Sequence, residues 1–198
     1  MANPLNTLIR YVSAAALCLT LAAAANTAEA SDIRHTVAQT DLCRVNPIRH
    51  APLRASKDAV INADLKLRAA IGAEVRARSQ REAAEERYAE LQASFAPRKE
   101  LKTAKAYSNW ARIEHRLTVA RLEQAEARRV LHSAELELGK LQLMESYELA
   151  AAHRYRASRF EDQFDDAMWD FERVSTRVER LEKRILSAKN DWEALATR

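Results

Sequence analysis

The sequence has few of the residues that build turns, with only 2 glycines and 4 prolines among 198 residues. A β-sheet protein of this length needs many tight turns, which rely on Gly, Pro, Asn and Asp. Alanine, leucine, glutamate, arginine and lysine dominate instead, which is typical of long helices and coiled coils. We therefore expect an all-α protein, an elongated antiparallel helical coiled coil.

Cysteine is also scarce, with Cys18 near the start and Cys43 further on. No Cys-x-x-Cys pair occurs, so neither a structural zinc site nor covalent haem is expected. Cys18 lies in an apolar leader, which leaves Cys43 as the one thiol of the exported chain. Cys43 is then either a free thiol or the site of an intermolecular disulfide.

Residues 1–30 have the pattern of a signal peptide. Arg10 precedes an apolar stretch over 11–25, and Ala28-Glu29-Ala30 follows as a small-x-small cleavage site. An uncleaved anchor is the alternative, but a spanning helix needs about 20 apolar residues. We predict a periplasmic or secreted protein of a Gram-negative bacterium, without a stable membrane span after signal cleavage.

The charges argue against a nucleic-acid partner. The formal net charge is +4 and the pI is about 9.2, but basic and acidic residues alternate and form no polybasic block. The charges are therefore interpreted as the solvated faces of helices.

Residues 31–55 contain prolines and show no apolar period, which predicts an extended, poorly ordered arm. A helical domain follows over 56–198, and Ser56 is expected to cap its first helix, over 56–95. Pro97 then makes a turn before a second helix over 98–138, and a further helix runs to 197. The first helix has a 3-4 seam that is weak where charges enter: Val60, Ala63, Leu67, Ala70, Glu74, Ala77, Arg81, Ala84, Tyr88, Leu91 and Phe95.

The second helix has a better seam, from Trp110 to Leu141, and the last third has the strongest. There eleven positions are spaced 4-3 without an error, which indicates a coiled-coil seam. They are Phe160, Phe164, Ala167, Phe171, Val174, Val178, Leu181, Ile185, Ala188, Trp192 and Leu195.

These last two seams are out of phase, and the apolar stripe changes sides near Gly139. Two structures explain the change. The chain either reverses there and forms a third helix of a bundle, or continues as one long helix. A lone glycine costs a helix only about 1 kcal/mol, which favours continuity. An unpaired seam of Phe and Trp would be exposed, which favours reversal.

No constellation of residues supports catalysis or a cofactor. His132 and Glu135 form a single i, i+3 pair, whereas carboxylate-bridged metal helices repeat Glu-x-x-His on two helices. Aromatic and arginine residues enrich at protein interfaces, which makes part of the last helix the best candidate surface for binding a protein. The interaction candidates are Phe160, Phe164, Trp169, Phe171, Leu181, Ile185 and Trp192.

We therefore expect an exported structural or interaction protein and not an enzyme. It would serve as a periplasmic coiled-coil spacer, scaffold or accessory component of an envelope or secretion assembly, and homo-oligomers are one form that it can take. The alternative is a periplasmic holdase chaperone that binds unfolded exported clients. A metal-binding helical bundle is a third hypothesis.

The leader leads to a first prediction. The native protein should begin near Ser31, because signal peptidase cleaves after a small-x-small triplet. N-terminal sequencing of protein isolated from the periplasm of a Gram-negative host measures this directly. A sequence that began at residue 1 would contradict cleavage.

Overall fold

A computed structural model describes residues 33–45 and 50–197 of the chain. The expected signal peptide at 1–30, including Cys18, lies outside these ranges. Helices make up 86% of the described residues, and no strand occurs among them, so the predicted all-α class is confirmed. None of the described helices is long and apolar enough to span a bilayer. The chain divides into units 1–34 and 35–198, and the second unit contains the described helices.

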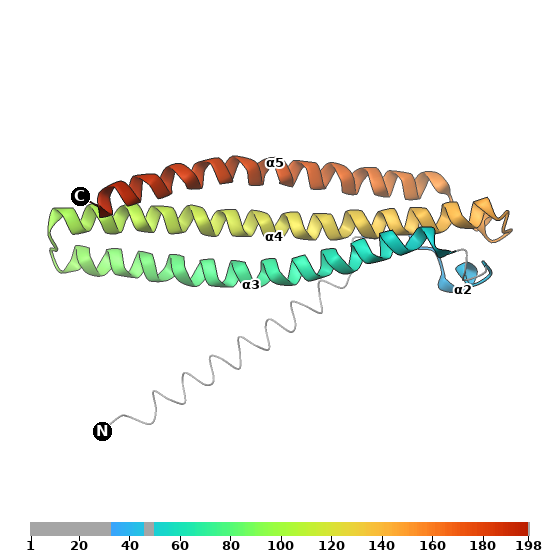
Figure 1. Cartoon of the computed structure of the whole chain (residues 1–198), viewed down its shortest axis with the longest axis horizontal. Helices are drawn as coiled ribbons and strands as arrows, with labels where there is room; N and C mark the ends of the chain where they lie inside the picture. The colour runs from blue at the N-terminus through green and yellow to red at the C-terminus, as the bar shows by residue number, and fades with distance from the viewer. Residues whose placement is uncertain (1–32, 46–49, 198) are drawn as a thin grey trace, which may run out of the picture. The chain divides into compact units, whose positions relative to one another are not determined.

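Three long helices make up the second unit: α3 (Pro52–Ala93), α4 (Arg98–Ser146) and α5 (Ala157–Ala196). α4 runs between the other two and packs along both of them (Figure 1). In the part of the chain that the structure describes, α3 and α5 do not pack along each other. The three helices therefore form an open layer rather than a closed bundle.

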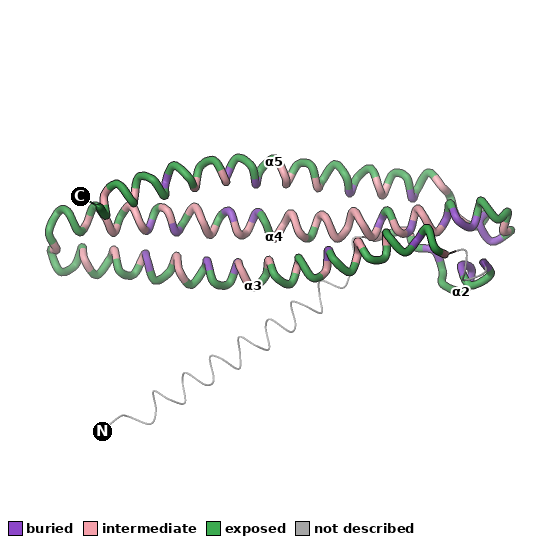
Figure 2. The backbone as a smooth tube through the Cα atoms, in the orientation of Figure 1, coloured by how far each residue is buried: buried purple, intermediate pink, exposed green. Residues whose placement is uncertain are grey.

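The α3–α4 contact follows the predicted seam of α3 but is made by small residues. Ala63, Ala77 and Ala84 are buried on α3, at positions that the seam predicts. Buried positions recur along each of the three helices (Figure 2). Alanines allow two helices to approach closely, but they are not the large interlocking side chains of a coiled coil. The expected coiled-coil hairpin is therefore not confirmed.

The ends of α3 differ from the sequence expectation. The helix begins at Pro52 and not at Ser56, because proline is well suited to the first turn of a helix. It ends at Ala93, and Phe95 in the following turn has a φ of 54° and is 93% exposed. Phe95 was expected to close the seam, and that expectation is wrong, since the chain has already left the helix there.

The α4–α5 contact confirms the predicted register of the last seam. All eleven of its positions are buried or half-buried. Near the middle, Val178 and Leu181 pack with Leu117 and Ala120 of α4, and Ile185 lies against them. The seam of α5 is therefore covered by the chain's own central helix.

The chain reverses after α4, as one of the two structures considered for the phase change requires. The reversal is not at Gly139, which lies inside α4. A methyl group added at Gly139 would lie 3.3 Å from Leu53 of α3, so the glycine permits a close approach. α4 ends at Ser146, and η2 (Ala152–Arg154) then leads into α5.

Residues 35–45, here called the N-terminal strap, cover the end of the layer where α4 turns into α5 (Figure 1). The strap contains the short helix α2 (Gln39–Leu42). Its buried residues Val37, Leu42 and Val45 join the core cluster that contains Leu141. The expectation of an extended, poorly ordered arm over 31–55 is therefore wrong for the strap and for the start of α3.

The α4–α5 contact leads to a second prediction. Leu181→Asp should lower the free energy of unfolding by about 3–5 kcal/mol, because it removes a buried leucine and places a carboxylate among apolar neighbours. The matched control is Leu186→Asp on the same helix, since Leu186 is 62% exposed. Urea denaturation followed by circular dichroism measures both. Equal midpoints for the two variants would contradict the packing of α5.

Candidate interaction surfaces

Most of the predicted interaction residues of α5 make contacts inside the chain. Phe160 is buried in the core cluster beside the strap, and its ring lies 5.9 Å from that of His35. Leu181 and Ile185 pack on α4, and Phe164 is half-buried. Their apolar surface is therefore largely occupied before any partner binds.

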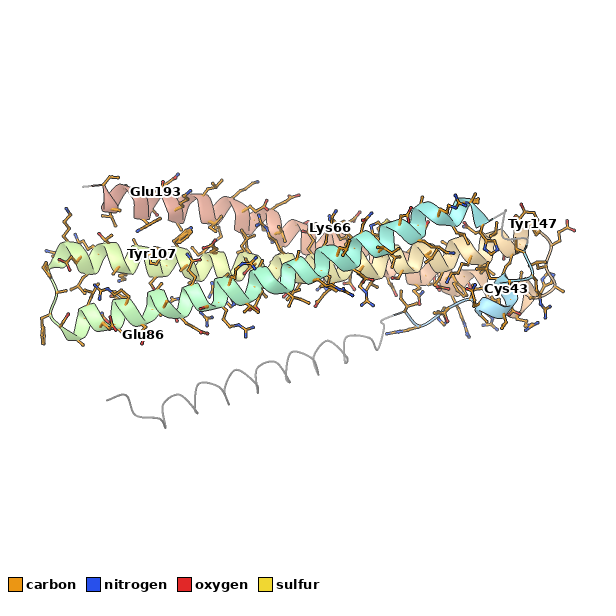
Figure 3. The ribbon with its side chains drawn as sticks, turned by 60° about the horizontal axis from the view of Figure 1, so that its bottom comes forward. Cys43, Lys66, Glu86, Tyr107, Tyr147 and Glu193 are labelled. Carbon is orange, nitrogen blue, oxygen red and sulfur yellow. The ribbon has the colours of Figure 1, made fainter. Side chains whose placement is uncertain are left out.

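Trp192 also lies in a contact that links all three helices. Its ring stacks on that of Trp110, with centroids 5.4 Å apart, and lies 5.1 Å from Tyr107. The Tyr107 hydroxyl accepts a hydrogen bond of 3.2 Å from Gln80 on α3. This cluster lies toward the end of the unit opposite Cys43, where Figure 3 labels Tyr107. It joins the two outer helices through α4.

Trp169 is the predicted residue that remains most exposed. It is 63% exposed, and the guanidinium of Arg173 lies 5.2 Å from its ring centroid. Phe171, two residues later, is half-buried below the guanidinium of Arg128 at 5.0 Å. Trp169 is therefore the exception, because the other candidates are buried or half-buried along α5.

Cys43 is exposed at the end of the unit that Tyr147 marks in Figure 3. Its sulfur accepts a weak contact of 3.7 Å from the Gln39 amide. The exposure leaves both expectations open, a free thiol or a disulfide between chains.

The strap is held by side chains that bind its backbone. Gln163 accepts a hydrogen bond of 2.8 Å from the His35 amide N–H, and Glu137 accepts one of 2.8 Å from that of Val37. The Tyr155 hydroxyl accepts a bond from Ala38 and donates one of 2.8 Å to Asp41. Burial, together with the Asp41 carboxylate, raises the pKa of Tyr155. Sequence periodicity could not reveal these contacts, since most of them join a side chain to a backbone N–H group.

A buried polar network crosses the α3–α4 contact where the seam of α3 is charged. Glu74 is 6% exposed and lies 3.0 Å from Nε2 of His115 on α4. Arg78 donates three hydrogen bonds of 2.8–3.0 Å to the same carboxylate, and Arg81 lies 3.3 Å from Nδ1 of His115. An imidazole with its proton on Nε2 satisfies both of its contacts. The network therefore joins α3 to α4 through polar side chains.

Two glutamates near this network have pKa values displaced in opposite directions. Burial alone would raise the pKa of Glu74, but its hydrogen bonds from His115 and Arg78 hold that pKa below the ordinary value. Burial raises the pKa of Glu114, and its Oε2 atom has no hydrogen-bond partner. The two carboxylates therefore contribute to stability with opposite signs at neutral pH.

An apolar surface that the sequence analysis missed lies on α3. Four apolar residues are 37–57% exposed there. Residues two positions apart in an α-helix point in directions that differ by about 200°, so Ile61 lies opposite the buried Ala63. One heptad series describes only the face of α3 that packs on α4, so it leaves out apolar residues on the opposite face. We call this set the outer stripe of α3: Ile61, Leu65, Ile71 and Val75.

The described residues show no group of three or more His, Cys, Asp or Glu side chains that could hold a metal ion. His132 and Glu135 lie 3.2 Å apart as an isolated pair. No protein-family model matches the chain, and no curated protein or solved structure is similar to it.

The two glutamates lead to a third prediction. Glu74→Gln should lower the free energy of unfolding at pH 7 by about 1–3 kcal/mol, because it weakens charge-assisted hydrogen bonds to a buried group. Since the folded pKa of Glu74 is lowered, this difference should fade as the pH falls from about 4.5 through that pKa.

Glu114→Gln is the matched control, with the opposite sign. The folded pKa of Glu114 is raised, so the cost of its ionised form appears as the pH rises above about 4.5. The variant should be at least as stable as the parent at pH 7 and equal to it in acid. Urea midpoints from pH 3 to 7 measure both, and a shift of the same sign for both variants would contradict these assignments.

Proposed function

We propose that this chain is exported to the periplasm and acts there as a scaffold or spacer of an envelope or secretion assembly, without catalysing a reaction. The observation that carries the proposal is the outer stripe of α3. These four apolar residues lie on one face of α3 and stay exposed, and exposed apolar surface of this kind can mark a protein interface.

The length and packing of the helices support this function. α4 has 49 residues, a length of about 73 Å at 1.5 Å per residue. Its two neighbours brace it on different sides, and stacked aromatic rings, the buried Glu74–His115 contact and partly exposed ion pairs connect them. A stiff element of this length can hold two partners a fixed distance apart, while the outer stripe supplies a place for one of them to attach.

A holdase chaperone is the second candidate, and the exposed side chains of α5 favour it. Met168 and Trp169 are 39% and 63% exposed, so apolar surface occurs on both outer helices. Scattered apolar contacts of this kind suit unfolded clients of many sequences. A scaffold would instead bind one partner in a fixed ratio.

This contrast gives a fourth prediction. A photo-crosslinking amino acid at Leu65, in the outer stripe, should give one discrete adduct in the periplasm of living cells. The same probe at Leu186 of α5 is the control, because that residue is equally exposed but has no apolar stripe around it. Adducts are separated by gel electrophoresis and identified by mass spectrometry.

The outcomes separate the two functions. One adduct from position 65 and none from position 186 supports the scaffold. Adducts of many masses from both positions, with suppressed aggregation of an unfolded outer-membrane protein, would support the holdase. Absence of any adduct at position 65 would contradict a binding role for the outer stripe.

A further inference from the structure

We infer that the outer stripe of α3 binds the same stripe of a second copy of this chain, in an antiparallel dimer centred on Arg68. This inference rests on the proposed binding role of the stripe and names its occupant. A two-fold dimer requires a surface that is complementary to itself, so that residue i meets j and j meets i. The outer stripe has that property in its sequence.

The apolar positions are symmetric about Arg68. Ile61 and Val75 lie seven residues before and after it, and Leu65 and Ile71 lie three residues before and after it. When two such helices run in opposite directions, Ile61 of each copy meets Val75 of the other. Every large apolar residue that is exposed on α3 then has an apolar counterpart.

The charges beyond the apolar positions favour the antiparallel direction. Arg54 is basic and Glu82 is acidic, and both lie beyond the apolar positions. Arg54 and Glu82 each lie fourteen residues from Arg68, so antiparallel pairing brings them together at both ends. Parallel pairing would instead place like charges side by side, at a cost.

The existing ion pairs of these residues are weak enough to rearrange. Glu82 is paired with its neighbour Arg81 at 3.3 Å on the surface, and such exposed pairs contribute about 0–1 kcal/mol. Arg54 has no ion-pair partner within the described residues. Glu82 can therefore offer its carboxylate, and Arg54 its guanidinium, to a second copy.

The centre of the interface is its least favourable part, because two positively charged Arg68 side chains meet there at the two-fold axis. Arginine can lay its methylenes on apolar neighbours and keep its guanidinium in water. Asp64 lies one helical turn from Arg68 in the same helix. Across the two-fold axis, Asp64 of the second copy lies one helical turn from the point where the two Arg68 side chains meet. The Asp64 side chain is 44% exposed although it binds Arg129 of α4 at 2.8 Å, so it remains partly accessible.

The size of the contact sets the expected strength. Residues 54–82 span about 43 Å of helix, and a contact one helix wide and that long falls at the small end of specific interfaces. We therefore expect a reversible dimer whose population rises with concentration.

Cysteine pairing tests the geometry, in the full chain with Cys18 and Cys43 replaced by serine. Arg68→Cys should form a disulfide-linked dimer under mild oxidation, because residue 68 meets its own copy at the axis. Ser79→Cys alone should not, because eleven residues on each side of the axis separate the two thiols by about 33 Å. A mixture of Lys57→Cys and Ser79→Cys proteins should form a mixed dimer, since these positions are symmetric about Arg68.

Two outcomes would overturn the dimer. Self-linking of Ser79→Cys as readily as of Arg68→Cys would indicate parallel or random contact. A failure of Arg68→Cys to link, with the mass of one chain at all concentrations in light scattering, would show that no such dimer forms. If the probe at Leu65 still captured one other protein in that case, the scaffold function would stand while the dimer failed.

A matched pair of variants separates loss of the dimer from loss of the fold. Leu65→Asp should weaken the dimer by about tenfold or more, because it places a carboxylate in an apolar contact. Its helix content and melting temperature should not change, since Leu65 is 57% exposed in the single chain. Leu186→Asp on α5 should leave both the dimer and the fold intact, and weakening by both variants alike would refute the assigned surface.

Discussion

The structure depends on the double-sided burial of α4. Both α3 and α5 pack along this helix and neither packs along the other, so over most of its length each outer helix is held by α4. On one side α4 meets α5 through Leu117 and Ala120, and on the other it meets α3 through His115. A helix with partners on two sides needs two buried faces, and α4 is accordingly half-buried or buried over most of its length.

This constraint explains which parts of the fold could be predicted. The seam of α5 was readable because α5 has one partner, so one period describes its whole buried face. The second seam, from Trp110 to Leu141, follows the face of α4 that meets α5, and at its end it also reaches the core cluster under the strap. The face that meets α3 carries polar and small residues such as Ser108 and His115, which are buried or half-buried without an apolar period. Hydrophobic spacing could not reveal that face.

Two other features were hidden from the sequence for a different reason, because tertiary contacts decide them. Gly139 was a candidate for the reversal, but in the structure it makes room for Leu53, which is distant in sequence. The N-terminal strap lacks any period because it is bound through its backbone to Glu137, Tyr155 and Gln163. Because tertiary contacts also cover the seam of α5, the outer stripe of α3 replaces that seam as the proposed binding surface.

The central claim is that α4 is shared by two helices that do not support each other, and hydrogen exchange of the backbone amides tests it most directly. Protection follows local stability, so a helix covered on two sides opens less often than one covered on a single side. In dilute protein, amides over residues 111–141 should exchange more slowly than those in the middle of α3 and of α5. Exchange in α3 or α5 as slow as in α4 would contradict the account, because it would require a further contact for that helix.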